Sequence, residues 1–146
     1  MQFGFQLNKN YEVGPVNPGD LREDVRKLYV KYRDKFVFKV PDENDYGNER
    51  RFYVYEWFTK DEEKIFYVGK GTGKRYNHIL SDMKRSRGIY YKELQDNFGI
   101  DYRIVAKELT NLEAEIYEIC WIHERTSQGE VLIQFVDGVC QESCRI

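Results

Sequence analysis

The chain has 146 residues, 41% of them hydrophobic, and a net charge of −2 from 23 basic and 25 acidic residues. This length suits one domain with an ordinary hydrophobic core and is too short to predict two. Because no run is apolar enough for a membrane span and the N-terminus lacks the basic-then-apolar pattern of a signal peptide, we expect a soluble, cytoplasmic protein.

The N-terminal part of the chain contains no chemical motif. Residues 1–18 are rich in glycine and proline, which favours irregular structure. Asp20 is placed to cap a helix that runs to about Asp34. A strand is predicted over residues 36–40, and the acidic, turn-rich run over 41–49 predicts a loop. We therefore expect an extension of unknown role over residues 1–50, followed by the main domain over residues 51–146.

Two aromatic segments predict a β-hairpin. Residues 51–58 and 65–68 are rich in the aromatic and β-branched types that favour strands, and the polar residues 60–63 between them predict the turn. With the turn centred near residue 62, Tyr55 faces a position near residue 68. Tyr67 is then its diagonal neighbour, so the two rings should lie within contact distance.

The segment after the hairpin combines glycines with basic residues. Residues 69–73 read Gly-Lys-Gly-Thr-Gly, which allows positive φ and close approach of another molecule to the backbone. A helix is predicted over about 74–84, with Arg75 in its first turn, and a second over about 89–97, ended by Gly99. The glycines do not have the spacing of a nucleotide-binding P-loop, which excludes that interpretation.

The C-terminal part predicts a strand, a helix and a strand. Residues 102–106 have strand character, Thr110 can cap a helix that runs to about Arg125, and residues 131–135 predict a short strand. Together with the hairpin, these elements predict a small α/β (α+β) fold, with a mixed or antiparallel central sheet flanked by helices.

The cysteines do not predict a metal site. The chain has three cysteines, Cys120, Cys140 and Cys144, so there is no second pair to complete a four-ligand zinc site. No histidine stands at ligand spacing from Cys140 and Cys144. We expect reduced thiols, with Cys120 in the core and the other two able to pair only in an oxidising setting.

Glu118 falls within the apolar stripe of the 110–125 helix, between Ala114 and Ile122. A carboxylate on a core-facing stripe requires an ion-pair partner or a cation, and both interpretations remain open from the pattern alone. The other acidic residues of this helix lie off the stripe and are expected to be solvated: Glu113, Glu115 and Glu124.

The positive charge is concentrated between residues 64 and 92, where eight basic residues accompany one acidic residue, Asp82. Such asymmetry is typical of a surface that binds a phosphate backbone, although a solvated helix face gives the same pattern. We expect DNA binding because the basic segment begins beside the two tyrosines. The candidate DNA-binding residues are Lys70, Lys74, Lys84, Arg85 and Arg87.

Two tripeptides, Tyr53-Val54-Tyr55 and Tyr67-Val68-Gly69, resemble the pair that gives the GIY-YIG nucleases their name. Tyr53 stands where the family has its first glycine. Arg75 is similar in position to the family's arginine, and the run from Glu113 to Glu118 is similar to its Glu-Ala-x-x-x-Glu motif. Gln134, shortly before an Asp-Gly turn, stands where the family usually has asparagine.

The resemblance implies a metal-dependent DNA endonuclease with one divalent cation, Mg²⁺ or Mn²⁺. It implies that Tyr55 orients or deprotonates the attacking water, that Tyr67 binds near the phosphate, and that Arg75 stabilises the developing charge. The remaining implied site residues are Glu118 as the metal ligand, His78 as a candidate base and Gln134 as a positioning amide.

Three questions remain open from the sequence. The chain could be a DNA-binding module that retained the fold and lost activity, or an interaction protein that uses its aromatic surface. Residues 1–50 could extend the substrate contact, form a dimer interface, or cover the site with their acidic loop. Double-strand cutting by one site per chain would favour a homodimer.

Overall fold

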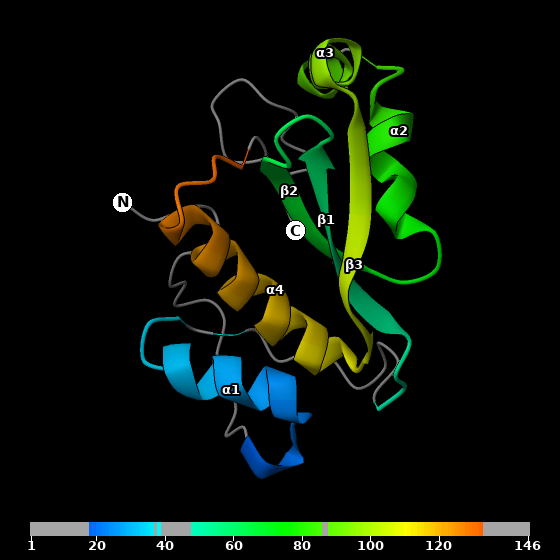
Figure 1. Cartoon of the computed structure of the whole chain (residues 1–146). Coiled ribbons are helices and arrows are strands. Elements are labelled where there is room, and N and C mark those ends of the chain that lie inside the picture. Colours follow the sequence, from blue (N-terminus) through cyan, green and yellow to red (C-terminus); the bar gives the residue numbers. More distant parts are fainter. Residues whose placement is uncertain (1–17, 37, 39–47, 86–87, 133–146) are drawn as a thin grey trace.

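A computed structural model describes residues 18–36, 38, 48–85 and 88–132 of the chain. Its helices and strands form a mixed α+β fold (Figure 1), as the sequence predicts. In chain order they are the 3₁₀ turn Pro18–Asp20, α1 (Glu23–Tyr32), β1 (Phe52–Thr59), β2 (Ile65–Gly71), the 3₁₀ turn Arg75–Asn77, α2 (His78–Asp82), α3 (Ile89–Phe98), β3 (Ile100–Leu109) and α4 (Asn111–Ser127).

The described strands form one antiparallel sheet in the order β2-β1-β3, with β1 at its centre. Tyr55 pairs with Gly69 and Trp57 pairs with Tyr67, one position away from the expected register. In the observed register Tyr67 is two positions from Gly69, so it is the diagonal neighbour of Tyr55 on the same face of the sheet, whereas a shift of one position would put the two side chains on opposite faces.

Both faces of the sheet are covered, so β1 has no solvated face. Val54 packs with α1 and α4 on one side, and Tyr55 and Trp57 pack in a second cluster with residues of α2 and α3. Figure 1 shows α1 and α4 on one side of the sheet and α2 and α3 on the other. Val54 and Tyr55 are at most 1% exposed, so both alternating positions of the strand contribute to the core.

The start of α1 differs from the sequence prediction. Asp20 lies in a preceding 3₁₀ turn, and α1 begins at Glu23 with Arg22 as an N-cap that makes no side-chain capping bond. The backbone N–H of Arg22 instead donates to the Glu113 carboxylate of α4, 2.8 Å away. A tertiary contact therefore replaces the local cap, which the sequence pattern cannot specify.

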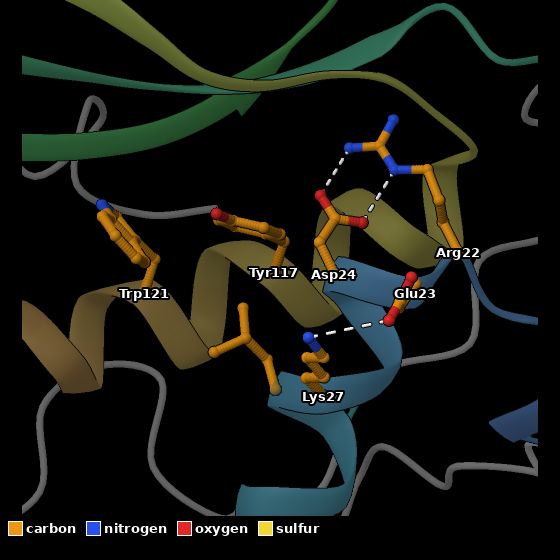
Figure 2. A pocket seen from close by; sticks show the side chains of 7 residues that line it. Arg22, Glu23, Asp24, Lys27, Tyr117 and Trp121 are labelled. Carbon is orange, nitrogen blue, oxygen red and sulfur yellow. Dashed lines mark hydrogen bonds and ion pairs between the residues drawn. The ribbon is translucent and has the colours of Figure 1, made fainter.

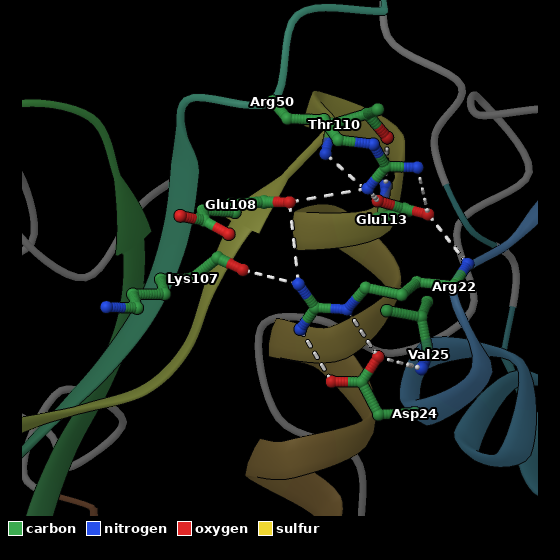
Figure 3. A network of polar contacts seen from close by, with 8 residues as sticks. All are labelled: Arg22, Asp24, Val25, Arg50, Lys107, Glu108, Thr110 and Glu113. Carbon is green, nitrogen blue, oxygen red and sulfur yellow. Dashed lines mark hydrogen bonds and ion pairs between the residues drawn. The ribbon is translucent and has the colours of Figure 1, made fainter.

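Glu113 connects α1, α4 and the end of β3 (Figure 3), so the expectation that it is solvated is wrong. It forms a capping box with Thr110, which caps α4 as predicted, and it also accepts hydrogen bonds from Arg50. Burial alone would raise the pKa of Glu113, but its backbone N–H donors and Arg50 hold that pKa below its usual value. The predicted extension also contributes Leu21 and Val25 to the main hydrophobic core.

The remaining helices and strands are of the predicted type, but their bounds differ from the predicted ones. The helix predicted over 74–84 is a 3₁₀ turn followed by the short α2, and the strand predicted over 102–106 extends to Ile100–Leu109. Gly99 ends α3 at a φ of 74°, a conformation that favours glycine. The strand predicted over 36–40 and the one over 131–135 fall largely outside the described residues.

Cys120 is buried in the core, as expected, and burial raises the pKa of its thiol to about 12. Cys140 and Cys144 lie outside the described residues. Within the part of the chain that the structure describes, no helix is long and apolar enough to cross a membrane.

Candidate active site

Tyr55 and Tyr67 stack on the face of the sheet that α2 covers. Their ring centroids are 6.1 Å apart with an interplanar angle of 26°, and both side chains are buried. Gly69 provides the space for this stack, because a Cβ at that position would lie 2.8 Å from the Tyr55 hydroxyl and 2.9 Å from the Tyr67 ring. The glycine of the Tyr-Val-Gly tripeptide therefore has a packing role that the sequence did not specify.

Burial raises the pKa of both phenols, that of Tyr67 well above its usual value. The positive charge of Arg75 opposes this in both tyrosines, and the negative charge of Glu118 adds to it in both. A hydrogen bond with Tyr67 also favours the ionised form of Tyr55. Arg75 and Glu118 therefore lie within electrostatic reach of the tyrosine pair, and neither phenol ionises at neutral pH without a cation or base beside it.

Arg75 is exposed at the end of β2, in the 3₁₀ turn that precedes α2. Gly71 packs against the Arg75 side chain, and a Cβ at Gly71 would be only 2.5 Å from it. Among the described residues, the Arg75 guanidinium makes no hydrogen bond or ion pair. Its charge is therefore available to an anion that approaches the tyrosine pair.

Tyr53, at the position of the family's first glycine, holds the backbone around Arg75. Its hydroxyl accepts from the N–H of Tyr76 at 3.0 Å and donates to the carbonyl of Gly73 at 2.9 Å. Trp57, on the same face of β1, donates its indole N–H to the carbonyl of Tyr76 at 2.9 Å. Two side chains of the central strand therefore fix the turn that carries the guanidinium.

Glu118 lies on α4 beside β2, which is an edge strand of the described sheet. It is 4% exposed, which confirms its place on the buried stripe, and it accepts a hydrogen bond from the backbone N–H of Lys70. Burial, followed by the charge of the nearby Glu115, raises the pKa of Glu118 to about 8, and Lys70 opposes this shift. Without a further cation, most Glu118 carboxyls are therefore protonated at neutral pH.

The side chain of Lys70 is directed to α4. Its ammonium donates to Asn111 Oδ1 and to Glu115 Oε1, each at 3.0 Å, so Glu115 is ion-paired rather than solvated as expected. Glu124 is also paired, with Lys31 and Tyr32. The other candidate DNA-binding side chains, Lys74, Lys84 and Arg85, are exposed. Arg87 and Gln134 lie outside the described residues.

His78 is buried beneath the tyrosine pair, with ring centroids 4.8 Å from Tyr67 and 6.1 Å from Tyr55. Its Nδ1 lies 3.4 Å from Oδ2 of the buried Asp82, one helical turn further along α2. The sequence pattern missed Asp82, although its i+4 spacing from His78 was a visible signal.

The donors present fit a cation that keeps most of its water. Among the described residues, no three histidines, cysteines or carboxylates gather in one group. Glu118 alone could supply a carboxylate, which suits Mg²⁺ or Mn²⁺ bound mainly by water and phosphate oxygens better than Zn²⁺. Because the pKa of Glu118 is near 8, a proton competes with such a cation.

A groove of about 600 Å³ lies on the other side of the sheet, between α1 and α4 (Figure 2). Its charged residues already pair with one another, Arg22 with Asp24 and Lys27 with Glu23. The groove therefore presents no free charge and is separated by the sheet from the tyrosine pair. We place the candidate site at the tyrosine pair and not in this groove.

No family model, curated protein or solved structure matches the chain. The relation to GIY-YIG nucleases is therefore a resemblance carried by residues and their positions.

Proposed function

We propose that the chain is a metal-dependent endonuclease that hydrolyses phosphodiester bonds in DNA. The observation that carries this proposal is the convergence of four side chains from separate elements. Tyr55 comes from β1, Tyr67 from β2, Arg75 from the following turn and Glu118 from α4. Two buried phenols, an exposed guanidinium and a buried carboxyl can together supply proton transfer, charge stabilisation and a metal ligand for phosphodiester hydrolysis.

Each group has a distinct task in this mechanism. Arg75 binds the phosphate and stabilises the negative charge that develops on its oxygens. Tyr55 orients the attacking water and takes its proton, and the hydrogen bond with Tyr67 stabilises the phenolate that this requires. The water oxygen attacks phosphorus and the bond between phosphorus and the leaving oxygen breaks. The leaving oxygen takes a proton from solvent, which balances the proton that Tyr55 lost when it became the phenolate.

Glu118 would hold Mg²⁺ or Mn²⁺ beside the edge of β2. The cation, when bound, neutralises charge on the phosphate and the leaving oxygen. The protein contributes the buried Glu118 carboxyl, which interacts with the backbone N–H of Lys70. The side chain of Lys70 forms an ion pair with Glu115. Glu115 therefore adds negative potential to the site while its own carboxylate is occupied.

The exposed basic residues would hold the DNA backbone near Arg75. Lys74 precedes Arg75, and Lys84 and Arg85 follow α2, which covers the tyrosine pair. Such contacts carry no sequence information and make affinity fall as salt is added. The exposed basic residues support DNA as the substrate. A homodimer would supply the second site needed to cut both strands.

The test is conversion of supercoiled plasmid to nicked or linear form with Mg²⁺, in wild type and in Glu118→Gln. Glutamine is close in shape to the protonated carboxyl, so this variant should fold. Glu93→Gln, at an exposed position of α3, is the matched control. We expect cutting in wild type and Glu93→Gln, and a loss of at least 100-fold in Glu118→Gln.

The alternative is a DNA-binding module without catalytic activity. The deep burial and raised pKa of Glu118 favour it, because a protonated carboxyl requires no metal. This alternative predicts binding without cutting, equal in wild type and Glu118→Gln, with Mg²⁺, Mn²⁺ and other divalent cations. The same experiment therefore separates the two functions.

A further inference from the structure

Apolar side chains reach solvent at one edge of the sheet, on the face that holds the tyrosine pair. Ile104 of β3 pairs with Tyr55 of β1, and Tyr102, two positions earlier on β3, pairs with Trp57. Directly paired residues point to the same face of a sheet. Ile104 is 39% exposed and Tyr102 is half-buried, whereas Tyr55 and Trp57 are at most 2% exposed. Because β3 is an edge strand of the described sheet, no described strand covers its outer side.

Tyr76 adds a second ring to this edge. It stacks on Tyr102, with ring centroids 4.5 Å apart and an interplanar angle of 23°, and the two side chains share a hydrogen bond. The backbone of Tyr76 is held twice, because its N–H donates to the Tyr53 hydroxyl and its carbonyl accepts from the Trp57 indole. Both stacked rings are half-buried, so part of each remains open to solvent. The stack is therefore fixed before a ligand arrives.

Two exposed cations lie next to the stack. Arg75 precedes Tyr76 in the same 3₁₀ turn, and Lys74 precedes Arg75. Neither side chain makes a hydrogen bond or ion pair with the residues that the structure describes. Open aromatic rings beside available cations are the combination that binds single-stranded nucleic acid, because the cations hold phosphates while the rings stack on bases. Bases inside a duplex already stack on one another, so an unpaired nucleotide is the one that offers its face to a side chain.

We infer that Tyr76, Tyr102 and Ile104 form a stacking surface for an unpaired nucleotide of the DNA, with the two exposed cations on its neighbouring phosphates. This inference rests on the proposed function and names the substrate class, which is DNA with a single-stranded segment beside the bond that is cut. Because Ile104 is the direct partner of Tyr55, the stacking surface lies next to the tyrosine pair.

The first experiment compares the affinities for two DNAs of equal length, a blunt duplex and a duplex that ends in a single-stranded tail. Fluorescence anisotropy in Ca²⁺, which limits cleavage, should show that wild type binds the tailed DNA about 10-fold more tightly. Tyr102→Leu keeps an apolar side chain but cannot stack, so it should remove this preference and leave the affinity for the blunt duplex unchanged. Tyr90→Leu, at an exposed position of α3, is the matched control and should change neither affinity.

The salt dependence of binding separates stacking from charge. Tyr102→Leu should weaken binding of the tailed DNA by the same factor at every salt concentration, because a stacked base releases no counterion. Arg75→Gln should instead reduce the slope of the logarithm of the binding constant against the logarithm of salt concentration by roughly 1. A reduced slope in Tyr102→Leu overturns the stacking role.

A photochemical cross-link identifies the contact in the unmodified protein. With 5-iodouracil in the tail, irradiation should join the base to Tyr76 or Tyr102, and mass spectrometry of the peptides locates the link. This measurement decides the question even if Tyr102→Leu fails to fold. Cross-links to other residues alone overturn the inference, and so does a tail preference that survives in a folded Tyr102→Leu. An equal loss of affinity for the blunt duplex would place a duplex end on the surface and also overturn it.

The two proposals fail in different ways. If the tailed DNA binds through Tyr102 but no divalent cation supports cutting of any DNA, the nuclease function fails and the stacking surface stands. If Mg²⁺ supports cutting while wild type binds both DNAs equally, the nuclease function stands and the stacking surface is overturned.

Discussion

Gly69 lies directly opposite Tyr55 across the β1–β2 ladder, and the Tyr55 hydroxyl occupies the space of the missing Gly69 side chain. A Cβ at Gly69 would be 2.8 Å from that hydroxyl, closer than Cβ contacts in folded proteins allow. The stack of Tyr55 on Tyr67 therefore depends on a residue that carries no chemistry itself.

Replacing Gly69 by alanine should displace the tyrosine pair. We expect Gly69→Ala to lower the free energy of unfolding by about 1–3 kcal/mol, because the surrounding face is closely packed. Urea denaturation followed by circular dichroism measures this change. In a double-mutant cycle, Tyr55→Phe should cost less in the Gly69→Ala background than in wild type, since it removes the hydroxyl that meets the new methyl. Independent, additive effects would contradict the contact.

Glu118 makes stability depend on pH. Its pKa is about 8 in the folded protein and near 4.5 in the unfolded chain, so the folded state binds this proton more tightly. The contribution of Glu118 to stability is therefore greatest below about pH 4.5 and is lost as the pH rises to about 8. Glu118→Gln cannot ionise, so its Tm should exceed that of wild type by an amount that grows over this range.

Divalent cations provide the control for this prediction. At pH 8, Mg²⁺ should raise the Tm of wild type and leave that of Glu118→Gln unchanged, because a ligand stabilises the state that binds it. Equal effects of Mg²⁺ on both proteins would place the cation elsewhere.

The sequence predicted the elements whose signals are local. The hairpin follows from its alternating aromatic residues, α4 from Thr110 and the Glu113 that completes its capping box, and the end of α3 from Gly99. Each depends on residues a few positions apart. The burial of Glu118 was also visible, because an apolar stripe on one helix predicts which of its residues face the core.

Features that depend on distant parts of the chain could not be predicted in the same way. Arg22 starts α1 by donating to Glu113, 91 residues away, and no local pattern contains that contact. Glu113 and Glu115 looked solvated because their partners, Arg50 and Lys70, come from other elements. The role of Tyr53 also required the fold, since its hydroxyl meets a backbone about 20 residues further along.

Tyr53→Phe should loosen the turn that carries Arg75. Its hydroxyl bonds the Tyr76 N–H and the Gly73 carbonyl, and loss of these bonds should lower the free energy of unfolding by about 1–2 kcal/mol. If the proposed function holds, kcat should fall because the guanidinium is less well placed. Tyr90→Phe, at an exposed position of α3, is the control. If Tyr53→Phe is destabilised but its kcat is unchanged, the hydrogen bonds of Tyr53 are not needed to position Arg75 for catalysis.

The exposed cations make a prediction about salt. If Lys84 and Arg85 contact DNA phosphates, the logarithm of the binding constant should fall linearly with the logarithm of salt concentration, and Lys84→Gln or Arg85→Gln should each reduce that slope by roughly 1. Fluorescence anisotropy with a labelled duplex, in Ca²⁺ to limit cleavage, measures the slope.

The matched control for the salt prediction is Lys92→Gln, which removes an equal charge from a lysine already paired with Asp96 on the surface of α3. Its slope should change less than that of the two variants above, because Asp96 already offsets much of the charge on Lys92. Equal changes in all three variants would indicate that DNA responds to the net charge of the segment. Changes limited to Lys84 and Arg85 would place individual phosphates beside α2, on the same side of the sheet as Tyr55 and Tyr67.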